Sequence, residues 1–247
     1  MRADSPLVDA LRPSPNFGDR VGPPPDAVVL HYTGMATAEG ALARLADADA
    51  QVSAHYVVLE DGRIVQMVAE DRRAWHAGRS CWQGETDMNS RSIGIEIVNP
   101  GHDGGLPPYP ARQIRAVAAL LSDIVSRRGI SPARVLAHSD IAPDRKEDPG
   151  ERFPWSVLAE QGLCVAARAA PIRGAPLTPD AALTRSVQRR LASIGYAAPE
   201  SGLWDDPTRL ALAAFQRRHR PRRVDGMLDR STLTTLARVE TVLAATI

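Results

Sequence analysis

A series of short apolar runs, each ending at turn residues or at a helical stretch, constrains the fold of this chain more than any other feature. Their length and their valine and isoleucine content predict buried β-strands at 27–31, 56–59, 64–68, 92–98 and 134–138. Helical spacing predicts a helix at 37–48, with Thr37 as its N-cap, and another at 110–128, with Gly129 just after its end. Strands mixed with helices predict an α/β domain, with a central mixed β-sheet flanked by helices, up to about residue 165.

The segments between these elements are predicted from their turn residues. Asp61-Gly62 is a preferred pair for a tight turn, so the second and third runs should form a hairpin. Residues 1–26 are rich in proline and glycine and are predicted to form an extended arm on the surface. Residues 72–91 show no regular pattern, and we expect a long loop of the kind that is usually functional or mobile.

The last third of the chain is helical in pattern. Its apolar spacing predicts a small all-α domain of three helices at about 180–194, 206–219 and 230–245. A bundle of this size is marginal unless it is well packed. The predicted domains are 1–165, which includes the arm, a linker at 166–178, and the helical domain at 179–247.

Composition excludes several classes of protein. Hydrophobic residues make up 44% of the chain, which is enough for a real core. The formal net charge is +1, so no overall field favours nucleic acid or a membrane surface. No run approaches the roughly 20 apolar residues of a membrane span, and no secretory signal is visible. We therefore expect a cytoplasmic monomer, with the periplasm or cell envelope as the alternative location. The two cysteines, Cys81 and Cys164, are expected to be free thiols.

A polar stretch at 137–150 holds a histidine, a lysine and several carboxylates, and its proline and glycine residues are expected to break any helix. His138 and Asp148 from this stretch, with His31 at the end of the first apolar run, could hold one zinc ion. A catalytic zinc takes three protein ligands and leaves a position open for water, whose pKa it lowers from about 15.7 to about 7. Each residue also has a structural interpretation: His31 could be a strand-end histidine bonded to a carbonyl, and Asp148 could belong to an ordinary turn.

Glu96 lies in a predicted buried strand with apolar neighbours on both sides. A buried carboxylate is costly unless it is paired or lies near a metal. Glu96 is therefore either half of a structural salt bridge with an arginine or a general base that acts on the water. Lys146 is either a solvated loop lysine or a positive charge for an oxyanion. These residues indicate metal-assisted hydrolysis without identifying the bond that is cleaved.

Five motifs occur in the order that is typical of one family: Leu30-His31-Tyr32-Thr33, Val52-Ser53-Ala54-His55-Tyr56, Ala74-Trp75-His76-Ala77-Gly78, Ser92-Ile93-Gly94-Ile95-Glu96, and the stretch from His138 to Gly150. They cover about residues 10–165. On these motifs the chain resembles the zinc-dependent N-acetylmuramoyl-L-alanine amidases of the amidase-2 group (AmpD- and AmiD-like proteins), which are related to peptidoglycan recognition proteins. The resemblance implies the α/β fold of that group.

The resemblance also implies one zinc ion per chain, with His31, His138 and Asp148 as ligands and Glu96 and Lys146 as catalytic partners. It implies hydrolysis of the amide between the lactyl group of N-acetylmuramic acid and the L-alanine of the stem peptide, in peptidoglycan or in soluble (anhydro)muropeptides. Two alternatives stay open: a non-catalytic protein that binds or senses peptidoglycan fragments, and a different zinc hydrolase such as a peptidase.

Four further residues are assigned to substrate binding: Tyr32, Trp75, His76 and Asn99. Trp75 offers an apolar face to a sugar ring, although Trp75 and His76 could instead be a core tryptophan and a satisfied histidine. His55 is expected to be structural, because a fourth protein ligand would close the site to water. His102 and His219 match none of the motifs and are predicted to be surface residues.

The C-terminal region resembles the peptidoglycan-binding type 1 domain. The resemblance rests on Val187 to Leu191, Gly202-Leu203-Trp204, Phe215-Gln216 and Val224-Asp225-Gly226. Ser201 stands where that family usually has an acidic residue, and Met227-Leu228-Asp229 also departs from its pattern. The alternative is that this region is a packing appendage that shapes the cleft.

Overall fold

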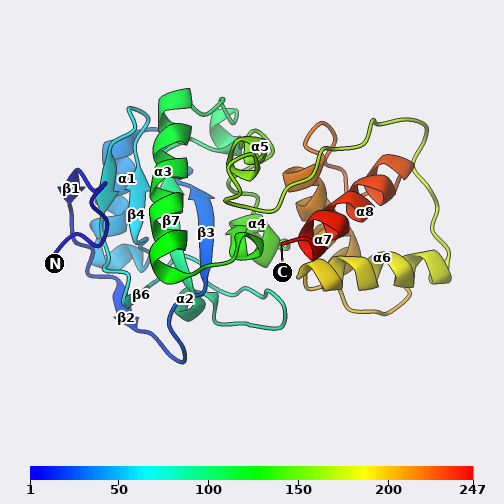
Figure 1. Ribbon diagram of the computed structural model, residues 1–247, viewed down its shortest axis with the longest axis horizontal. Coiled ribbons are helices and arrows are strands. Elements are labelled where there is room, and N and C mark those ends of the chain that lie inside the picture. The colour runs from blue at the N-terminus through cyan, green and yellow to red at the C-terminus, as the bar shows by residue number, and fades with distance from the viewer. Residues whose placement is uncertain (247) are drawn as a thin grey trace.

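The computed structural model describes residues 1–246. A six-stranded sheet forms the middle of its N-terminal part, and the C-terminal helices lie beside it (Figure 1). Its strands are β1 (Ala10–Leu11), β3 (Ala27–Tyr32), β4 (Tyr56–Val58), β5 (Ile64–Gln66), β7 (Ser92–Ile97) and β8 (Val135–Ala137). They lie in the order β1-β5-β4-β7-β3-β8. Neighbouring strands are parallel except for the β4–β5 hairpin. The predicted mixed sheet and hairpin are confirmed.

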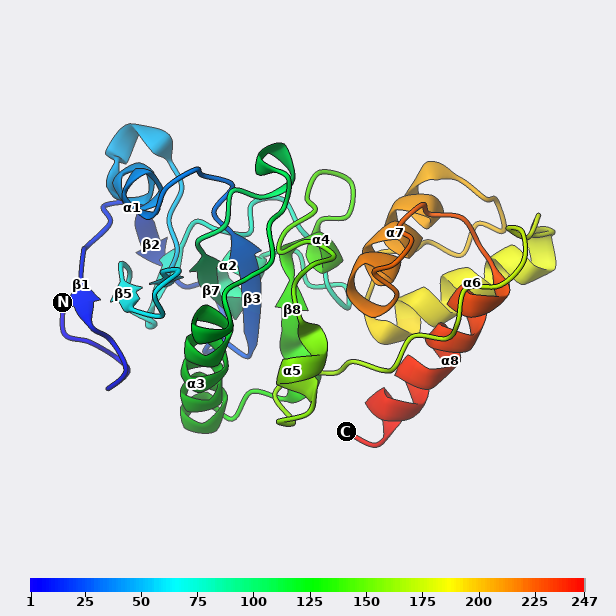
Figure 2. The ribbon, with the colours of Figure 1, turned by 90° about the horizontal axis from the view of Figure 1, so that it is seen from above.

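One face of the sheet is covered by α3 (Ala111–Arg128), which runs alongside the strands in front of the sheet in Figure 1 and lies to one side of them in Figure 2. The apolar side of α3 buries Val117 and Leu121 in one cluster with Leu30 and Ile95 of the sheet. The helix ends as predicted at Gly129, whose backbone is left-handed (φ 65°) and whose N–H donates to a carbonyl of the last turn.

The opposite face is covered at its two ends by different helices. At one end, Val57 of β4 packs with the apolar side of α1 (Ala38–Ala46), which Thr37 caps as predicted. At the other end, Val29 of β3 and Leu136 of β8 pack with the C-terminal helices. Side chains alternate between the two faces along a strand. No helix within residues 1–246 covers the middle of this face, over β7, and the cavity described below lies there.

The C-terminal helices are α6 (Ala181–Ile194), α7 (Asp206–His219) and α8 (Arg230–Ala244), close to the three predicted segments. We call residues 181–244 the helical module. Each helix begins after an aspartate whose side chain accepts a main-chain N–H of the first turn. The buried side chains of the module belong to one cluster with those of β3 and β8, so the bundle does not have to be stable on its own. The predicted domain boundaries stay a prediction.

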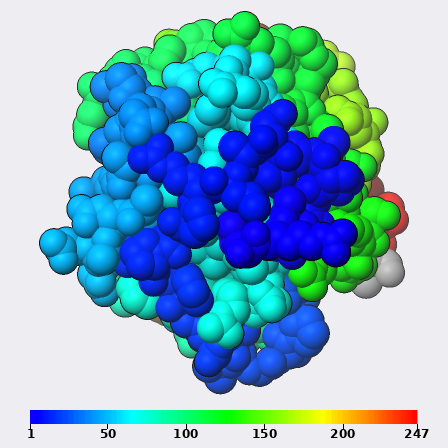
Figure 3. Space-filling view, turned by 90° about the vertical axis from the view of Figure 1, so that its left-hand side faces the viewer, coloured from blue at the N-terminus to red at the C-terminus, as the bar shows by residue number. Residues whose placement is uncertain are grey.

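The arm at 1–26 lies across the outer surface (dark blue in Figure 3). It contributes β1 to the edge of the sheet and β2 (Phe17–Asp19), which pairs antiparallel with β6 (Arg72–Ala74). Asn16 anchors it, because its Nδ2 donates to two main-chain carbonyls at 2.7 and 2.8 Å.

Two sequence predictions are corrected here. Residues 72–91 are not a loop throughout, since β6 lies at one end of the segment and α2 (Met88–Arg91) at the other. The last strand ends at Ala137, and His138 begins the short helix α4 (His138–Ile141) instead of ending the strand. The Asp140 carboxylate accepts the Ala137 N–H at 2.8 Å, which supports a helical turn ahead of the proline and glycine.

Four short elements have no counterpart in the sequence prediction: α5 (Trp155–Ala159) and the 3₁₀ turns Ala48–Ala50, His102–Gly104 and Pro132–Arg134. None of the helices within residues 1–246 is long and apolar enough to cross a membrane. Cys81 and Cys164 are free, as expected.

Candidate functional site

Parallel strand ends bring the predicted ligands together. In the β3–β7 pairing His31 lies opposite Glu96, and in the β3–β8 pairing Leu30 lies opposite Ala137, so that His138 follows directly. The carboxyl ends of parallel strands meet at one edge of a sheet, where ligand sites commonly form. Alternation along β3 and β7 turns His31 and Glu96 to the face that α3 does not cover.

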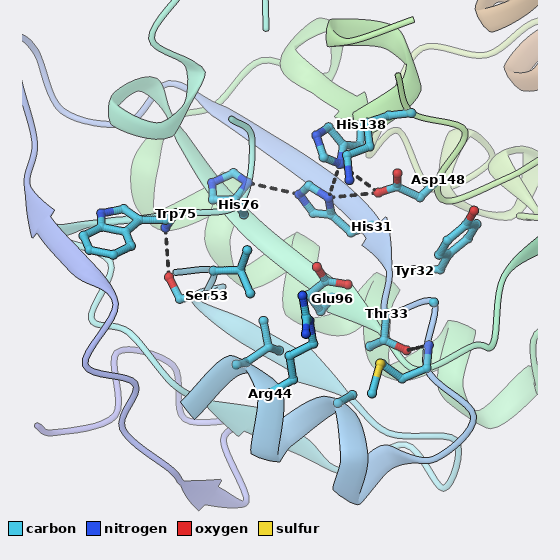
Figure 4. A pocket seen from close by; sticks show the side chains of 16 residues that line it. His31, Tyr32, Thr33, Arg44, Ser53, Trp75, His76, Glu96, His138 and Asp148 are labelled. Carbon is cyan, nitrogen blue, oxygen red and sulfur yellow. Dashed lines mark hydrogen bonds and ion pairs between the residues drawn. The ribbon is translucent and has the colours of Figure 1, made fainter. Parts of the chain in front are cut away.

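A cavity of about 290 Å³ opens at this edge, beside α1 (Figure 4). It is lined by all five residues to which the sequence assigns metal binding or catalysis: His31, Glu96, His138, Lys146 and Asp148. The two histidines and Asp148 are buried, whereas Glu96 is partly exposed. The fold therefore joins residues that are as far as 117 positions apart in the chain.

Three potential ligand atoms converge in this cavity. His31 Nδ1 lies 2.9 Å from His138 Nδ1, and each of them lies 3.0 Å from Asp148 Oδ2. The partner on the far side of each ring decides which nitrogen carries the hydrogen. His138 Nε2 faces the Ala77 carbonyl oxygen at 3.1 Å and must donate to it. A neutral His138 ring therefore keeps a lone pair on Nδ1.

The same reasoning fixes the ring of His31 through His76. Ser92 Oγ donates to the Met88 carbonyl, so that its lone pair accepts from His76 Nε2 at 3.4 Å. His76 Nδ1 is then an acceptor, and the donor to it is His31 Nε2 at 3.0 Å. His31 therefore also turns a lone pair on Nδ1 toward Asp148.

Two imidazole lone pairs and a carboxylate oxygen thus face one another at 2.9–3.0 Å, which is repulsive unless a cation lies among them. His31, His138 and Asp148 form a cluster that could hold a metal ion. Two histidines and a carboxylate are a ligand set of catalytic zinc sites. The outer N–H of each ring is already bonded, as is usual for metal-bound histidines. The residues fit a zinc ion.

The charge states of these groups suit metal binding at neutral pH. Burial and the neighbouring His138 lower the pKa of His31 to about 4, so its ring is neutral. Neutral imidazole and ionised carboxylate are the forms that bind metals.

Glu96 is the unpartnered acid of the cavity. Its Oε2 is buried without a hydrogen-bond partner, and no arginine among residues 1–246 forms a salt bridge with it, so the structural alternative is not seen. Burial raises the pKa of Glu96 well above its usual value; Asp148 adds to the rise and Lys146 opposes it. A carboxyl group with a raised pKa in a cavity is suited to taking up and releasing a proton.

The four residues assigned to substrate binding differ in position. Tyr32, Trp75 and His76 line the cavity. Trp75 lies at the end away from the ligands in Figure 4, and the Tyr32 hydroxyl lies 3.0 Å from His102 Nδ1. Asn99 is not among the lining residues, and its amide donates to one main-chain carbonyl at 3.0 Å and accepts one main-chain N–H at 2.9 Å. Asn99 therefore holds a loop, and its assignment to substrate binding stays a prediction.

Two other histidines can be compared with their predictions. His55 is structural, as predicted: its Nδ1 accepts the Gly94 N–H at 2.9 Å, and its Nε2 lies 3.0 Å from the Arg72 carbonyl oxygen. The surface position predicted for His219 is wrong, since it is 4% exposed and its ring lies 4.8 Å from that of Phe215. Their spacing of four residues on a helix was a signal that they share a buried side.

The contacts on the outer side of the His31 and His138 rings were not predicted from the sequence. His76 lines the cavity, but its Nδ1 is occupied by His31. Its ring packs on Gly94, where an added Cβ would come within 2.5 Å of it. Arg145 donates to the Ala77 carbonyl, the same oxygen that His138 contacts. Gly94 was the one available signal, because a glycine inside a strand often marks the close approach of another group.

We expect His76→Phe to weaken zinc binding by about 10–100-fold, the usual cost of losing a partner behind a metal ligand. Phenylalanine keeps a ring against Gly94 but offers no acceptor to His31 Nε2. Competition with a chromophoric chelator measures the dissociation constant. Trp75→Phe, at the far end of the cavity, is the control. Equal affinity in His76→Phe and the wild type would contradict this arrangement.

The metal-free protein should lose stability as the pH falls from about 6.5 toward 4. Burial lowers the pKa of His31 to about 4 and that of His55 to about 3, from 6.5. In this window the unfolded chain binds more protons than the folded chain. The free energy of unfolding therefore decreases as the pH is lowered, by up to about 1.4 kcal/mol per pH unit for each imidazole ring. Burial also lowers the pKa values of His76 and His219 well below 6.5, so Glu96, whose raised pKa acts in the opposite direction, is one group against four. Urea unfolding at about pH 7 and pH 5 measures the change, and equal or higher stability at the lower pH would contradict it.

Comparison with known proteins finds relatives over most of the chain. A family model described as N-acetylmuramoyl-L-alanine amidase matches residues 21–151, and one described as a putative peptidoglycan binding domain matches residues 181–236. N-acetylmuramoyl-L-alanine amidase AmiD of Escherichia coli is 38% identical over 222 residues, which covers 83% of this chain and 78% of AmiD. 1,6-anhydro-N-acetylmuramyl-L-alanine amidase AmpD of Enterobacter cloacae is 42% identical over 105 residues, or 42% of this chain and 54% of AmpD.

Two solved structures extend the similarity to both parts of the fold. AmiD from E. coli, in complex with the substrate anhydro-N-acetylmuramic acid-L-Ala-D-gamma-Glu-L-Lys, has a TM-score of 0.75 and 35% identity, covering 93% of this chain and 98% of that chain. AmpDh3 from Pseudomonas aeruginosa, in complex with anhydromuramic pentapeptide, has a TM-score of 0.73 and 32% identity, covering 90% of this chain and 93% of that chain. At these coverages the similarity includes the sheet and the helical module.

Proposed function

We propose, since the chain belongs to the N-acetylmuramoyl-L-alanine amidase family, that it hydrolyses the amide between the lactyl group of N-acetylmuramic acid and the L-alanine of the stem peptide. The observation that carries this proposal is one cavity in which three ligand atoms converge beside an unpartnered carboxyl group. Soluble anhydromuropeptides are the proposed substrates, because both related complexes contain one. Intact peptidoglycan is the second candidate, which the match of the helical module to a peptidoglycan binding domain supports.

We assign one zinc ion per chain to His31, His138 and Asp148. When bound, zinc supplies a Lewis acid that polarises a carbonyl oxygen and lowers the pKa of a coordinated water from about 15.7 to about 7. The protein holds the two rings in place from behind, through His76 and the Ala77 carbonyl.

Glu96 is assigned the proton transfers. Its Oε2 takes a proton from the attacking water as the water oxygen adds to the lactyl carbonyl carbon. The carbon–nitrogen bond then breaks, and Glu96 returns the proton to the nitrogen of L-alanine. The products are a lactyl carboxylate and a stem peptide with a free amino group. The ammonium group of Lys146, on the cavity wall, stabilises the negative charge on the carbonyl oxygen before the bond breaks.

The test is release of free stem peptide from a purified anhydromuropeptide, followed by liquid chromatography and mass spectrometry. We expect release by the zinc-loaded protein, loss of release after treatment with a chelator, and recovery when zinc is added back. Binding of the anhydromuropeptide without release would instead support a sensor. Cleavage of a peptide that lacks the muramyl group would support a peptidase. Comparing intact sacculi with anhydromuropeptides in the same assay decides between the two substrate candidates.

The cytoplasmic location and the monomeric state expected from the sequence stay predictions. Trp75 and Tyr32 stay our candidates for contacts with the substrate, because both line the cavity beside the proposed metal site.

A further inference from the structure

The segment 138–148, which we call the metal loop, carries two of the three proposed ligands and contacts α7 of the helical module. Arg218 of α7 forms a buried ion pair with Asp140, with Nη1 lying 2.5 Å from Oδ2 and side-chain exposures of 5% and 0%. Its Nη2 donates to the carbonyls of Val135 and Val165 at 3.0 and 2.9 Å. Its guanidinium lies over the Trp155 ring, 4.1 Å from the ring centroid. Arg218 is thus fixed by partners on several sides.

Asp140 connects this ion pair to the first ligand of the loop. Its Oδ2 also accepts the N–H of Ala137, the residue before His138, at 2.8 Å. Its Oδ1 accepts the hydroxyl of Tyr196 at 2.7 Å, and Tyr196 belongs to the helical module as well. Two side chains of the module therefore hold the helical turn that begins at His138.

Arg217, the preceding residue of α7, contacts the other end of the loop. Its Nη2 lies 2.7 Å from Oε1 of Glu147, which directly precedes the ligand Asp148. The Arg217 side chain is only 10% exposed. Within the loop, the Ser139 N–H donates to the Asp148 carbonyl at 3.0 Å and closes the two ends on each other. Successive residues of a helix point about 100° apart, so neighbouring arginines can reach both ends.

We propose that Arg217 and Arg218 are positioning residues for the metal site: α7 holds both ends of the metal loop, and the helical module thereby preorganises His138 and Asp148 for zinc. This proposal rests on the zinc site of the proposed function. A site whose ligands are already held loses less conformational freedom when the metal binds, so it binds more tightly. The helical module then contributes to metal binding without having to contact the substrate.

A purely electrostatic role for the two arginines has the opposite consequence. Both side chains are positively charged and lie near a site for a divalent cation. Removing either charge should therefore strengthen zinc binding if repulsion is what matters. If the arginines act by holding the loop, their removal should weaken zinc binding. The sign of the change separates the two roles.

The experiment measures the zinc dissociation constant by chelator competition in the full chain. We expect Arg218→Met to raise the constant at least about tenfold, the lower end of the range for partners behind a ligand, and Arg217→Gln to raise it about fivefold, below that range because Glu147 is not itself a ligand. Arg218→Lys keeps a charge for Asp140 but cannot reach both carbonyls, and should fall in between. Hydrogen exchange of the Ser139 amide in the zinc-free protein should quicken in the same order.

Arg190→Gln is the matched control, because it removes the Arg190–Glu240 ion pair (2.7 Å) between α6 and α8 without touching the metal loop. Its zinc affinity should stay within about twofold of the wild type. If Arg218→Met does not fold, Arg217→Gln decides, since its partner Glu147 is half exposed. Unchanged or tighter zinc binding with unchanged Ser139 exchange would overturn the proposal. A wild-type protein without zinc affinity would overturn the proposed function, and Ser139 exchange would still show whether α7 holds the loop.

Discussion

Glu96→Gln is expected to lower kcat for release of the stem peptide by about 10²–10⁴-fold, the usual contribution of a general acid–base group. Glutamine has nearly the same shape but cannot carry the proton from the water to the L-alanine nitrogen. Because Glu96 Oε2 has no hydrogen-bond partner, the change breaks no hydrogen bond at that atom. Steady-state kinetics on an anhydromuropeptide, together with zinc content by elemental analysis, measures both parts of this expectation.

Zinc content and KM should change little in Glu96→Gln, because Glu96 is not one of the three converging ligands. Glu39→Gln is a suitable control, since Glu39 lies on α1 but is not among the residues that line the cavity, and its side chain is 76% exposed. It should keep the wild-type rate. A Glu96→Gln protein with full zinc and wild-type kcat would show that another group moves the proton.

His31→Ala is expected to lose its zinc. Its zinc affinity should fall by more than about 100-fold, which is the largest usual effect of removing a partner behind a ligand. It removes one of the three atoms that meet at 2.9–3.0 Å and leaves only His138 Nδ1 and Asp148 Oδ2. Elemental analysis after dialysis should find far less than one zinc per chain. Added zinc should also no longer raise the melting temperature, because a metal stabilises only the fold that binds it.

The matched control for this loss is His102→Gln. His102 is half-buried and contacts the Tyr32 hydroxyl, but it is not among the converging ligands. It should keep zinc at the wild-type stoichiometry. Full zinc stoichiometry in His31→Ala would refute the ligand set, whatever the activity of that variant.

The strands were predictable where their signal is local. The apolar runs at 27–31 and 92–98 became β3 and β7 with ends shifted by one residue, because burial on both faces requires continuous apolar residues. The strand β6 was missed in the segment 72–91 because its partner is β2 of the distant arm. Its sequence, Arg72-Arg73-Ala74, has no apolar pattern of its own.

The candidate site was predictable to a different degree. Each residue of the cavity, taken alone, could also have had a purely structural role. Only the order of the five motifs along the chain indicated His31, His138 and Asp148 as ligands and Glu96 as a catalytic residue. The contacts by which the Asn99 amide holds a loop were visible only in the tertiary structure. The role of His76 behind His31 needed the full chain of hydrogen bonds to Ser92.

By itself the sequence determined where the apolar strands that carry His31 and Glu96 lie. Periodicity and turn residues encode such facts over a few positions. Tertiary structure alone decided which nitrogen of each histidine faces the proposed metal position, and that α7 contacts the metal loop. The reason is that these facts depend on contacts across long stretches of chain, 45 positions between His31 and His76 and 78 between Asp140 and Arg218. No local pattern specifies a hydrogen bond at that separation.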